Sequence, residues 1–442
     1  MRRRAVRISH PAQAIALSFA VAFAAGTILL MLPFASTTQT DVVTAMFTTA
    51  SAVCVTGLAV VDTPSHWTMF GKVVILGLIQ AGGLGIMTFA SLIAILLSRR
   101  LGLRSRLTAS ATTRTTGMED VRRVVRTVVT IGFTVEAVVA VVLFVRFLTA
   151  YSYDVPRAAW YALFHAVSAF NNAGFALYSD SLMGFVADPW ICLPIAAAVI
   201  VGGIGFPVLI ELRRTLGRRL SMSTSLVLLG TAVLLLGGWL AVMVLEWNNP
   251  ATFGDLDGPA RVLAAFVAST MSRTAGFNSV DIGAMLPETL LTQDILMFIG
   301  AGPAGTAGGI KITTFGVLFF ILLTELKGEG AVNVFRRRLP RSVHREALTV
   351  ALLSVAVVIA TTGALLWLTD ASGDQAAFEA ISAFGTVGLS TGITADIPDS
   401  GRLLLTLVMF IGRLGPLTLG TSLALRSEKL HYELPKERPL IG

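Results

Sequence analysis

The sequence has few charged residues and almost no cysteine. Of its 442 residues, 14% are charged and 54% are hydrophobic, and the two cysteines are Cys54 and Cys192. So little polar surface cannot cover soluble domains of this total size, and two cysteines form neither a disulfide framework nor a metal cluster. The histidines also lack metal-ligand spacing: His10, His66, His165, His344 and His431. We therefore expect a polytopic membrane protein, and the composition argues against a zinc or redox enzyme.

The net charge of +8 does not indicate binding to nucleic acid. That interpretation requires a basic face with aromatic residues or a known module, and the sequence has neither. Lysine and arginine gather instead at both ends of the chain and after alternate apolar segments. The positive-inside rule places these regions in the cytoplasm. We expect a multi-pass protein of the cell's inner (plasma) membrane with both termini cytoplasmic.

Eight apolar segments are long enough to span a bilayer. They are residues 12–32, 67–97, 124–148, 191–210, 223–246, 291–324, 347–368 and 402–425. Shorter stretches lie between the members of successive pairs, at residues 41–52, 157–170, 259–272 and 374–384. At 1.5 Å per residue they are too short for a hydrocarbon layer of roughly 30 Å, so we expect re-entrant helices.

The predicted fold is therefore all-α, with eight transmembrane helices in four repeated units. Each unit contains a span, a pore helix, a loop and a second span. The units are residues 12–97, 124–210, 223–324 (with a broken second span) and 347–425, followed by a cytoplasmic tail at 426–442. An even number of spans gives all units one orientation, so they can surround a central pore. Inverted repeats, the usual basis of carriers that work by a rocking motion, need an odd number of spans in each unit.

A repeated pattern follows each short helix. Its glycines are Gly57, Gly174, Gly276 and Gly388, each with a hydroxyl residue six positions earlier. Glycine lets carbonyls turn toward a common line, and four such loops can replace the hydration shell of potassium. One stretch alone fits an ordinary turn, but four in the same setting favour a filter. The predicted potassium-binding residues are Val55, Thr56, Gly57, Asn171, Asn172, Ala173, Gly174, Thr274, Ala275, Gly276, Thr386, Val387 and Gly388.

The sixth apolar segment contains a glycine-rich stretch that cannot remain helical. Glycine costs roughly 1 kcal/mol and proline roughly 3 kcal/mol against alanine in a helix interior. We predict a broken span and a mobile gate loop made of Gly302, Pro303, Ala304, Gly305, Thr306, Ala307, Gly308 and Gly309.

The letters Gly300-x-Gly302-x-x-Gly305 also match a dinucleotide fingerprint, which leaves a membrane-bound nucleotide enzyme as an alternative. That motif needs a preceding strand and a βαβ unit, which these apolar surroundings do not predict.

Lys311 and Arg413 lie far from the ends of their apolar segments, so we expect both cations to lie well inside the bilayer. Such a charge costs about 2.5 to 3.5 kcal/mol on insertion scales, so it indicates function. We expect Arg413 to face the pore and to bond gate-loop carbonyls, with Lys311 anchoring the same loop; the alternative is that both snorkel to an interface. Arg273 either tunes the filter or braces the pore helix through a carboxylate, and Glu136 is left as a buried structural partner.

The loops on the outer side are strongly acidic. Three aspartates follow repeat glycines closely, Asp62, Asp180 and Asp281, and we expect them to line an outer vestibule. Acidic walls raise the local concentration of cations at the mouth of a narrow path. The alternative is that these loops merely avoid positive charge to satisfy topology.

These features together resemble the Trk/Ktr/HKT superfamily of potassium transporters, and specifically the Ktr-type membrane subunit. The most specific stretches are Val53-Cys-Val-Thr-Gly57-Leu, Arg273-Thr-Ala-Gly276-Phe-Asn and Gly305-Thr-Ala-Gly-Gly-Ile-Lys311. The resemblance implies potassium uptake by a fourfold pseudosymmetric pore. It also implies a homodimer in membrane lipid, on a cytoplasmic ring of nucleotide-binding regulatory subunits.

In this superfamily, plant members that prefer sodium have serine at the first filter position, where this chain has Gly57, so the resemblance points to potassium. Potassium is then the substrate and no cofactor is expected, with sodium left open as a coupling ion. We expect a transporter and not an enzyme. The alternatives that remain are a secondary carrier for another small solute and a sodium-permeable homologue.

Overall fold

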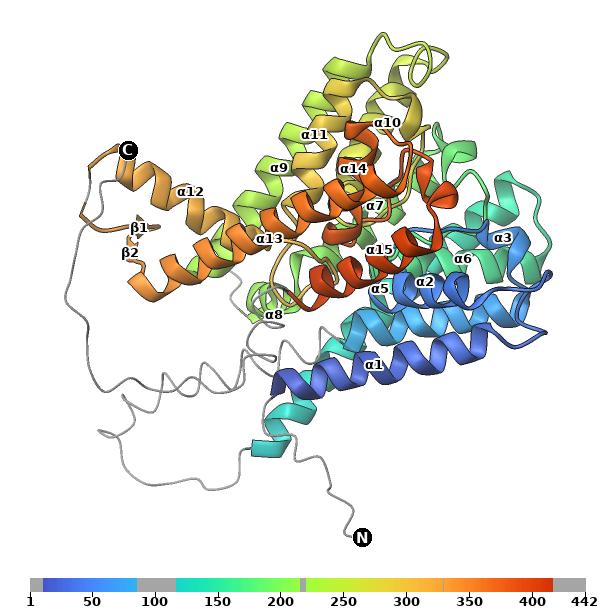
Figure 1. Ribbon diagram of the computed structural model, residues 1–442, viewed down its shortest axis with the longest axis horizontal. Helices are drawn as coiled ribbons and strands as arrows, with labels where there is room; N and C mark the ends of the chain where they lie inside the picture. The colour runs from blue at the N-terminus through green and yellow to red at the C-terminus, as the bar shows by residue number, and fades with distance from the viewer. Residues whose placement is uncertain (1–10, 86–116, 215–219, 329, 416–442) are drawn as a thin grey trace.

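A computed structural model describes residues 11–85, 117–214, 220–328 and 330–415 of the chain. Within these ranges the protein is almost entirely helical (Figure 1), so the all-α class is confirmed. The longer helices are α1 (Pro11–Leu30), α2 (Val42–Val53), α5 (Gly117–Ala150), α6 (Val155–Phe170), α7 (Pro189–Ile204), α8 (Phe206–Arg214), α9 (Met222–Glu246), α10 (Gly258–Met271), α11 (Pro287–Phe298), α12 (Ile312–Leu326), α13 (Arg341–Leu368), α14 (Gly373–Gly385) and α15 (Asp399–Leu414). A further apolar helix covers Met69–Gly85, and α3 is the short turn Thr63–His66. Strands β1 (Asn333–Val334) and β2 (Arg337–Arg338) form a small antiparallel hairpin.

Three of the described helices are long and apolar enough to cross a membrane: Val125–Ala150 within α5, then α9 and α13. Their apolar side chains face outward, as Leu240 of α9 and Trp367 of α13 do. Because exposed apolar helix faces belong in hydrocarbon, these helices identify a membrane protein. The other predicted spans are shorter, interrupted or continue beyond the described residues, so the eight-span layout stays a prediction.

The four predicted short helices are present as α2, α6, α10 and α14. Each begins where the sequence supplies a start signal. The Asp41 side chain accepts a hydrogen bond from the Thr44 amide, and Pro156 and Pro259 occupy the first turns of α6 and α10. Helix α14 departs slightly, because its N-cap is Ser372, which forms a capping box with Gln375.

The second helices of two units are broken in different ways. Helices α7 and α8 meet at an angle of 91° at Gly205, whose φ is 93°. The apolar segment expected to span the bilayer at residues 191–210 is therefore bent within its length, because glycine reaches this left-handed conformation easily and ends the helix there. The break predicted in the sixth span is confirmed: α11 and α12 are separated by the non-helical residues 299–311.

Helix packing closes the arrangement into a ring. Each short helix packs against the first helix of its own unit, in the pairs α1–α2, α5–α6, α9–α10 and α13–α14. Neighbouring units meet through α7–α10 and α11–α14, and α15 packs on α2, which joins the end of the chain to its beginning. Figure 1 shows this last contact as red beside blue. The four short helices therefore point their C-terminal loops into one shared interior.

Candidate functional site

The four repeat glycines come together in a closed ring. They all have positive φ angles: Gly57 95°, Gly174 69°, Gly276 71° and Gly388 96°. Each lies against the loop of the next unit, so a Cβ atom built on it would meet a carbonyl oxygen there. The distances are 2.5 Å from Gly57 to Ala173, 2.9 Å from Gly174 to Ala275, 2.3 Å from Gly276 to Val387 and 2.1 Å from Gly388 to Thr56. Only glycine fits at these four positions.

The ring also shows which carbonyl oxygen lies beside each glycine. The residue just before each glycine supplies the oxygen that the neighbouring glycine approaches: Thr56, Ala173, Ala275 and Val387. All four of these residues are buried. The structure therefore brings together loops that lie about a hundred residues apart in the sequence, with one main-chain oxygen of each loop beside the glycine of its neighbour.

A second conformational feature repeats in every loop. The residue two positions before each glycine adopts a left-handed conformation: Val55 (φ 56°), Asn172 (58°), Thr274 (68°) and Thr386 (49°). This region is unfavourable for β-branched residues such as valine and threonine, at about 1–3 kcal/mol each, and it persists only where the surroundings impose it. No sequence signal predicted it.

The hydroxyl residue six positions before each glycine ties the loop to its helix, but in two ways. The Ser51 hydroxyl accepts a hydrogen bond from the Gly57 amide (3.0 Å), and Ser382 does the same for Gly388 (3.1 Å). In the second unit the Ser168 hydroxyl donates to the Phe175 carbonyl (2.8 Å). The third unit has no such tie among the described contacts, because the Thr270 hydroxyl donates within its own helix.

An outer cavity of about 370 Å³ opens on one side of the ring. It is lined by the four glycines and by residues that follow them, including Asp62 and Asp281. The Ser179 hydroxyl donates to Asp62 at 3.0 Å. Of the three aspartates expected to line an outer vestibule, Asp62 and Asp281 line this cavity and Asp180 does not.

Glycines of the second helices lie on the other side of the ring. A Cβ on Gly82 would lie 2.0 Å from the Val53 carbonyl oxygen, on Gly202 2.0 Å from that of Phe170, and on Gly412 1.8 Å from that of Phe384. Each of these carbonyls ends or nearly ends a short helix. Glycine at these points therefore lets the second helix approach the base of each loop.

The third unit replaces this contact with the loop at residues 299–311. A Cβ on Gly308 would lie 2.3 Å from the Thr386 hydroxyl and 3.0 Å from the Gly385 oxygen, so the loop reaches the base of the fourth filter loop. On its other side it lies on the α7–α8 break, through bonds from the Gly302 amide to the Gly203 carbonyl (2.8 Å) and from the Thr306 amide to the Gly202 carbonyl (3.2 Å). The two broken helices thus hold each other.

Lys311 and Arg413 both donate hydrogen bonds to this loop, as the sequence predicted. The buried Arg413 donates to the Thr306 carbonyl oxygen and, at 3.3 Å, to the Gly82 carbonyl oxygen. Lys311 donates to the Ala307 carbonyl oxygen. The Thr306 hydroxyl also donates to Asn172 Oδ1 at 2.8 Å, so this one residue joins the loop to a filter residue and to α15.

The structure gives specific partners to Arg273 and Glu136. Arg273 is 5% exposed and donates to the carbonyl oxygens of Thr231 and Gly300, both at 3.4 Å, so the expected carboxylate partner is replaced by backbone. Glu136 accepts hydrogen bonds from Gln80 (3.0 and 3.1 Å) and from Asn171 (3.1 Å). Arg273 therefore holds the start of the third loop against Thr231 and Gly300, and Glu136 holds the start of the second loop through Asn171.

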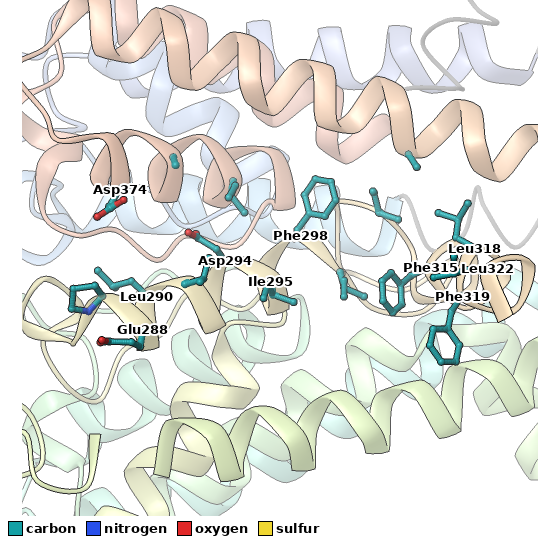
Figure 2. A pocket seen from close by; sticks show the side chains of 17 residues that line it. Glu288, Leu290, Asp294, Ile295, Phe298, Phe315, Leu318, Phe319, Leu322 and Asp374 are labelled. Atoms are coloured by element: carbon teal, nitrogen blue, oxygen red, sulfur yellow. The ribbon is translucent and has the colours of Figure 1, made fainter. Parts of the chain in front are cut away.

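The largest described cavity lies away from the ring. Figure 2 shows this groove of about 970 Å³, with Asp294 and Asp374 toward one end and Phe315, Leu318 and Phe319 toward the other. Its lining comes mostly from α11 to α14 and is mostly apolar. It includes Ile299 and Ile310 at the two ends of the loop at residues 299–311, but no residue of the ring or of the outer cavity. This groove is therefore separate from the ring and from the outer cavity beside it.

Comparisons with known proteins agree over nearly the whole chain. The TrkH family, described as cation transport protein, matches residues 2–432. The chain is 40% identical over 433 residues to Ktr system potassium uptake protein B of Bacillus subtilis, covering 98% of this chain and 97% of that protein. It is 32% identical over 457 residues to the potassium/sodium uptake protein NtpJ of Enterococcus hirae, covering 100% and 99%. The crystal structure of the potassium transporter TrkH from Vibrio parahaemolyticus has the same fold, with a TM-score of 0.78 at 18% identity over 96% of this chain and 87% of that one.

Proposed function

The chain belongs to the TrkH family of cation transport proteins, and from this premise we propose that it takes potassium up across the membrane through the glycine ring. The observation that carries this proposal is the closed contact of Gly57, Gly174, Gly276 and Gly388, each against the carbonyl of the next loop. A ring of backbone oxygens replaces the water that a potassium ion loses. Potassium is the substrate, and transport needs no covalent chemistry.

The carbonyl oxygens of Thr56, Ala173, Ala275 and Val387 are the central ligands in this mechanism. The left-handed residues two positions before the glycines hold the loops in the conformation that turns these oxygens inward. Because the strain is built into all four loops, the oxygens are oriented before an ion arrives. Asp62 and Asp281 raise the cation concentration at the mouth.

The loop at residues 299–311 acts as a gate below the ring. Irregular backbone within a membrane is tolerated where it is buried in protein or lines a cavity, and this loop contacts two filter loops and the α7–α8 break. Arg413 holds the loop through Thr306, and its positive charge opposes cation passage while the loop is in place. Release of these bonds opens the path.

The four units are then arranged about an axis along the membrane normal, with eight membrane segments in all and both termini in the cytoplasm. The packing of α15 on α2 supports this arrangement, since it joins the fourth unit to the first. The short helices α2, α6, α10 and α14 enter from the outer side and end at the ring.

Regulation comes from a separate protein in this proposal. The chain acts as a homodimer on a cytoplasmic nucleotide-binding ring. The glycine fingerprint starting at Gly300 does not supply a nucleotide site, because α11 precedes it and the strands in the described part of the chain are the short β1 and β2. The relatives named as Ktr system components support a multi-component assembly.

The test is rubidium uptake by purified protein in liposomes, compared with empty liposomes. We expect uptake that potassium competes strongly and sodium competes poorly. Strong competition by sodium would favour the sodium-permeable alternative, for which the relative named as a potassium/sodium uptake protein provides a precedent. Absence of uptake above empty liposomes would overturn the proposal.

A further inference from the structure

One register position behind the filter differs sharply among the four units. The residue nine positions before each ring glycine is Thr48, His165, Val267 or Glu379, in chain order. All four side chains are buried, with at most 2% of their surface exposed. Two units therefore bury a small or apolar side chain here, and two bury a histidine or a glutamate.

His165 joins its helix to the segment beyond the second filter loop. Its Nδ1 lies 2.7 Å from the Tyr161 carbonyl oxygen, and its Nε2 lies 3.3 Å from the Leu177 amide nitrogen. A carbonyl can only accept and an amide can only donate, so these partners select the tautomer with a proton on Nδ1. Leu177 lies three residues after Gly174, so the imidazole holds the outer end of this loop.

Glu379 makes the corresponding link in the fourth unit. The Thr394 hydroxyl donates to its Oε1, and Thr394 is bonded to Ser390 at 2.8 Å. Ser390 in turn accepts from the Gly392 amide at 3.0 Å. Glu379 thus holds the segment just after Gly388, while its Oε2 has no hydrogen-bond partner in the described part of the chain.

These two braces lie on opposite sides of the ring. The glycine contacts run from Gly57 to Gly174, Gly276 and Gly388 and back, so the second and fourth loops face each other. In the first and third units, which lie between them, the hydroxyl of Thr48 in α2 has no described partner and Val267 in α10 has no polar group. Burial of a carboxyl group or an imidazole costs free energy. The second and fourth units nevertheless bury one at the position where the other two units have threonine or valine.

We propose that His165 and Glu379 are positioning residues that set the discrimination between potassium and sodium, by holding the outer ends of two opposed filter loops. This inference rests on the proposed function. Discrimination depends on how closely and how strongly the ring oxygens meet an ion. A loop released at its outer end can close on the smaller sodium ion, so loss of a brace should lower selectivity more than it lowers potassium uptake.

The experiment measures the ratio of rubidium uptake inhibition by potassium and by sodium in liposomes. Glu379→Leu and His165→Phe remove the acceptors, and each should lower the ratio about tenfold, which corresponds to about 1.4 kcal/mol. Glu379→Gln keeps an oxygen that accepts from Thr394, so it should stay within about twofold of the wild type. The matched controls are Thr48→Val and Val267→Thr, which should leave the ratio unchanged.

A second variant approaches the same bond from the loop. Thr394→Val removes the donor while Glu379 stays in place, so it should reproduce the loss seen in Glu379→Leu, and it decides the question if Glu379→Leu does not fold. An unchanged ratio in Thr394→Val, or an equal loss in Thr48→Val, would overturn the inference. Wild-type protein without rubidium uptake would instead overturn the proposed function.

Discussion

The filter ring and the layer beneath it are built by opposite rules. In the ring, loops of different sequence adopt one backbone conformation, with a left-handed residue two positions before a left-handed glycine in all four units. In the layer beneath, the second helices diverge, although Gly82, Gly202 and Gly412 make equivalent contacts in three of the units. One bends by 91° at Gly205, and another is interrupted over residues 299–311.

This difference shows that the four units are equivalent in the backbone of their ring loops and not in their second helices. In the proposed mechanism the ring oxygens meet one ion from four sides, so their geometry has to match even though the side chains differ. The layer beneath has no such requirement, and the loop at residues 299–311 there occupies space that four identical helices would have closed. Its contacts are accordingly with specific partners, such as Arg413 and Asn172.

The largest effect should come from replacing one of the four ring glycines, so that its loop can no longer adopt the conformation of the other three. Gly388→Ala places a methyl group 2.1 Å from the Thr56 carbonyl oxygen, at a φ of 96° that alanine adopts only with strain. We expect rubidium uptake in liposomes to fall about a hundredfold. Gly363→Ala in α13 is the control, because a Cβ there meets nothing within 4 Å. Uptake within twofold of wild type in Gly388→Ala would contradict the ring as the ion site.

An intermediate effect, in the opposite direction, should come from releasing the gate. A variant lacking residues 303–307 should increase uptake about tenfold, and Arg413→Ala should increase it less, because Lys311 and Asn172 still hold the loop. Arg413→Lys is the matched variant, since lysine keeps the charge but lacks the planar fork that reaches both Thr306 and Gly82.

Unchanged uptake in both the deletion and Arg413→Ala would remove the gate from the mechanism. A rise in Arg413→Ala that Arg413→Lys fully reverses would assign the effect to charge and not to the hydrogen bonds.

The smallest effect should come from the outer cavity, which is not repeated fourfold either. Asp62→Asn or Asp281→Asn should raise the potassium concentration for half-maximal uptake about two- to threefold at low ionic strength, and high salt should remove the difference. Asp180→Asn is the control, because Asp180 does not line this cavity. The same shift in Asp180→Asn would mean that overall surface charge, and not the cavity, attracts the ion.

Much of this arrangement was predictable from local sequence. The short helices were placed to within a few residues, because segment length and start signals such as Asp41 and Pro259 act locally. The break in the sixth span followed from its glycines and proline. The bonds of Arg413 and Lys311 to the gate loop followed from the cost of a charge in the bilayer, which requires a buried polar partner.

Other features depend on contacts between distant segments, which a local pattern does not contain. Nothing in the sequence around Val55 or Thr386 indicates a left-handed backbone, because the surrounding units impose it. The bend at Gly205 was missed because its segment is uniformly apolar and the Pro303 carbonyl that crowds it lies in another unit. Asp180 was misplaced because distance along the chain from a glycine does not determine which way a loop turns.

The sequence by itself determined the membrane class and the four glycines that meet in the ring, because hydrophobic length and the freedom of a residue without a side chain are local properties. Tertiary structure alone decided the order of the ring, which carbonyls face each glycine, and which unit's broken helix supports the gate. Those outcomes depend on close packing between units, where a Cβ atom 2 to 3 Å from a neighbouring carbonyl is excluded whatever the local sequence prefers.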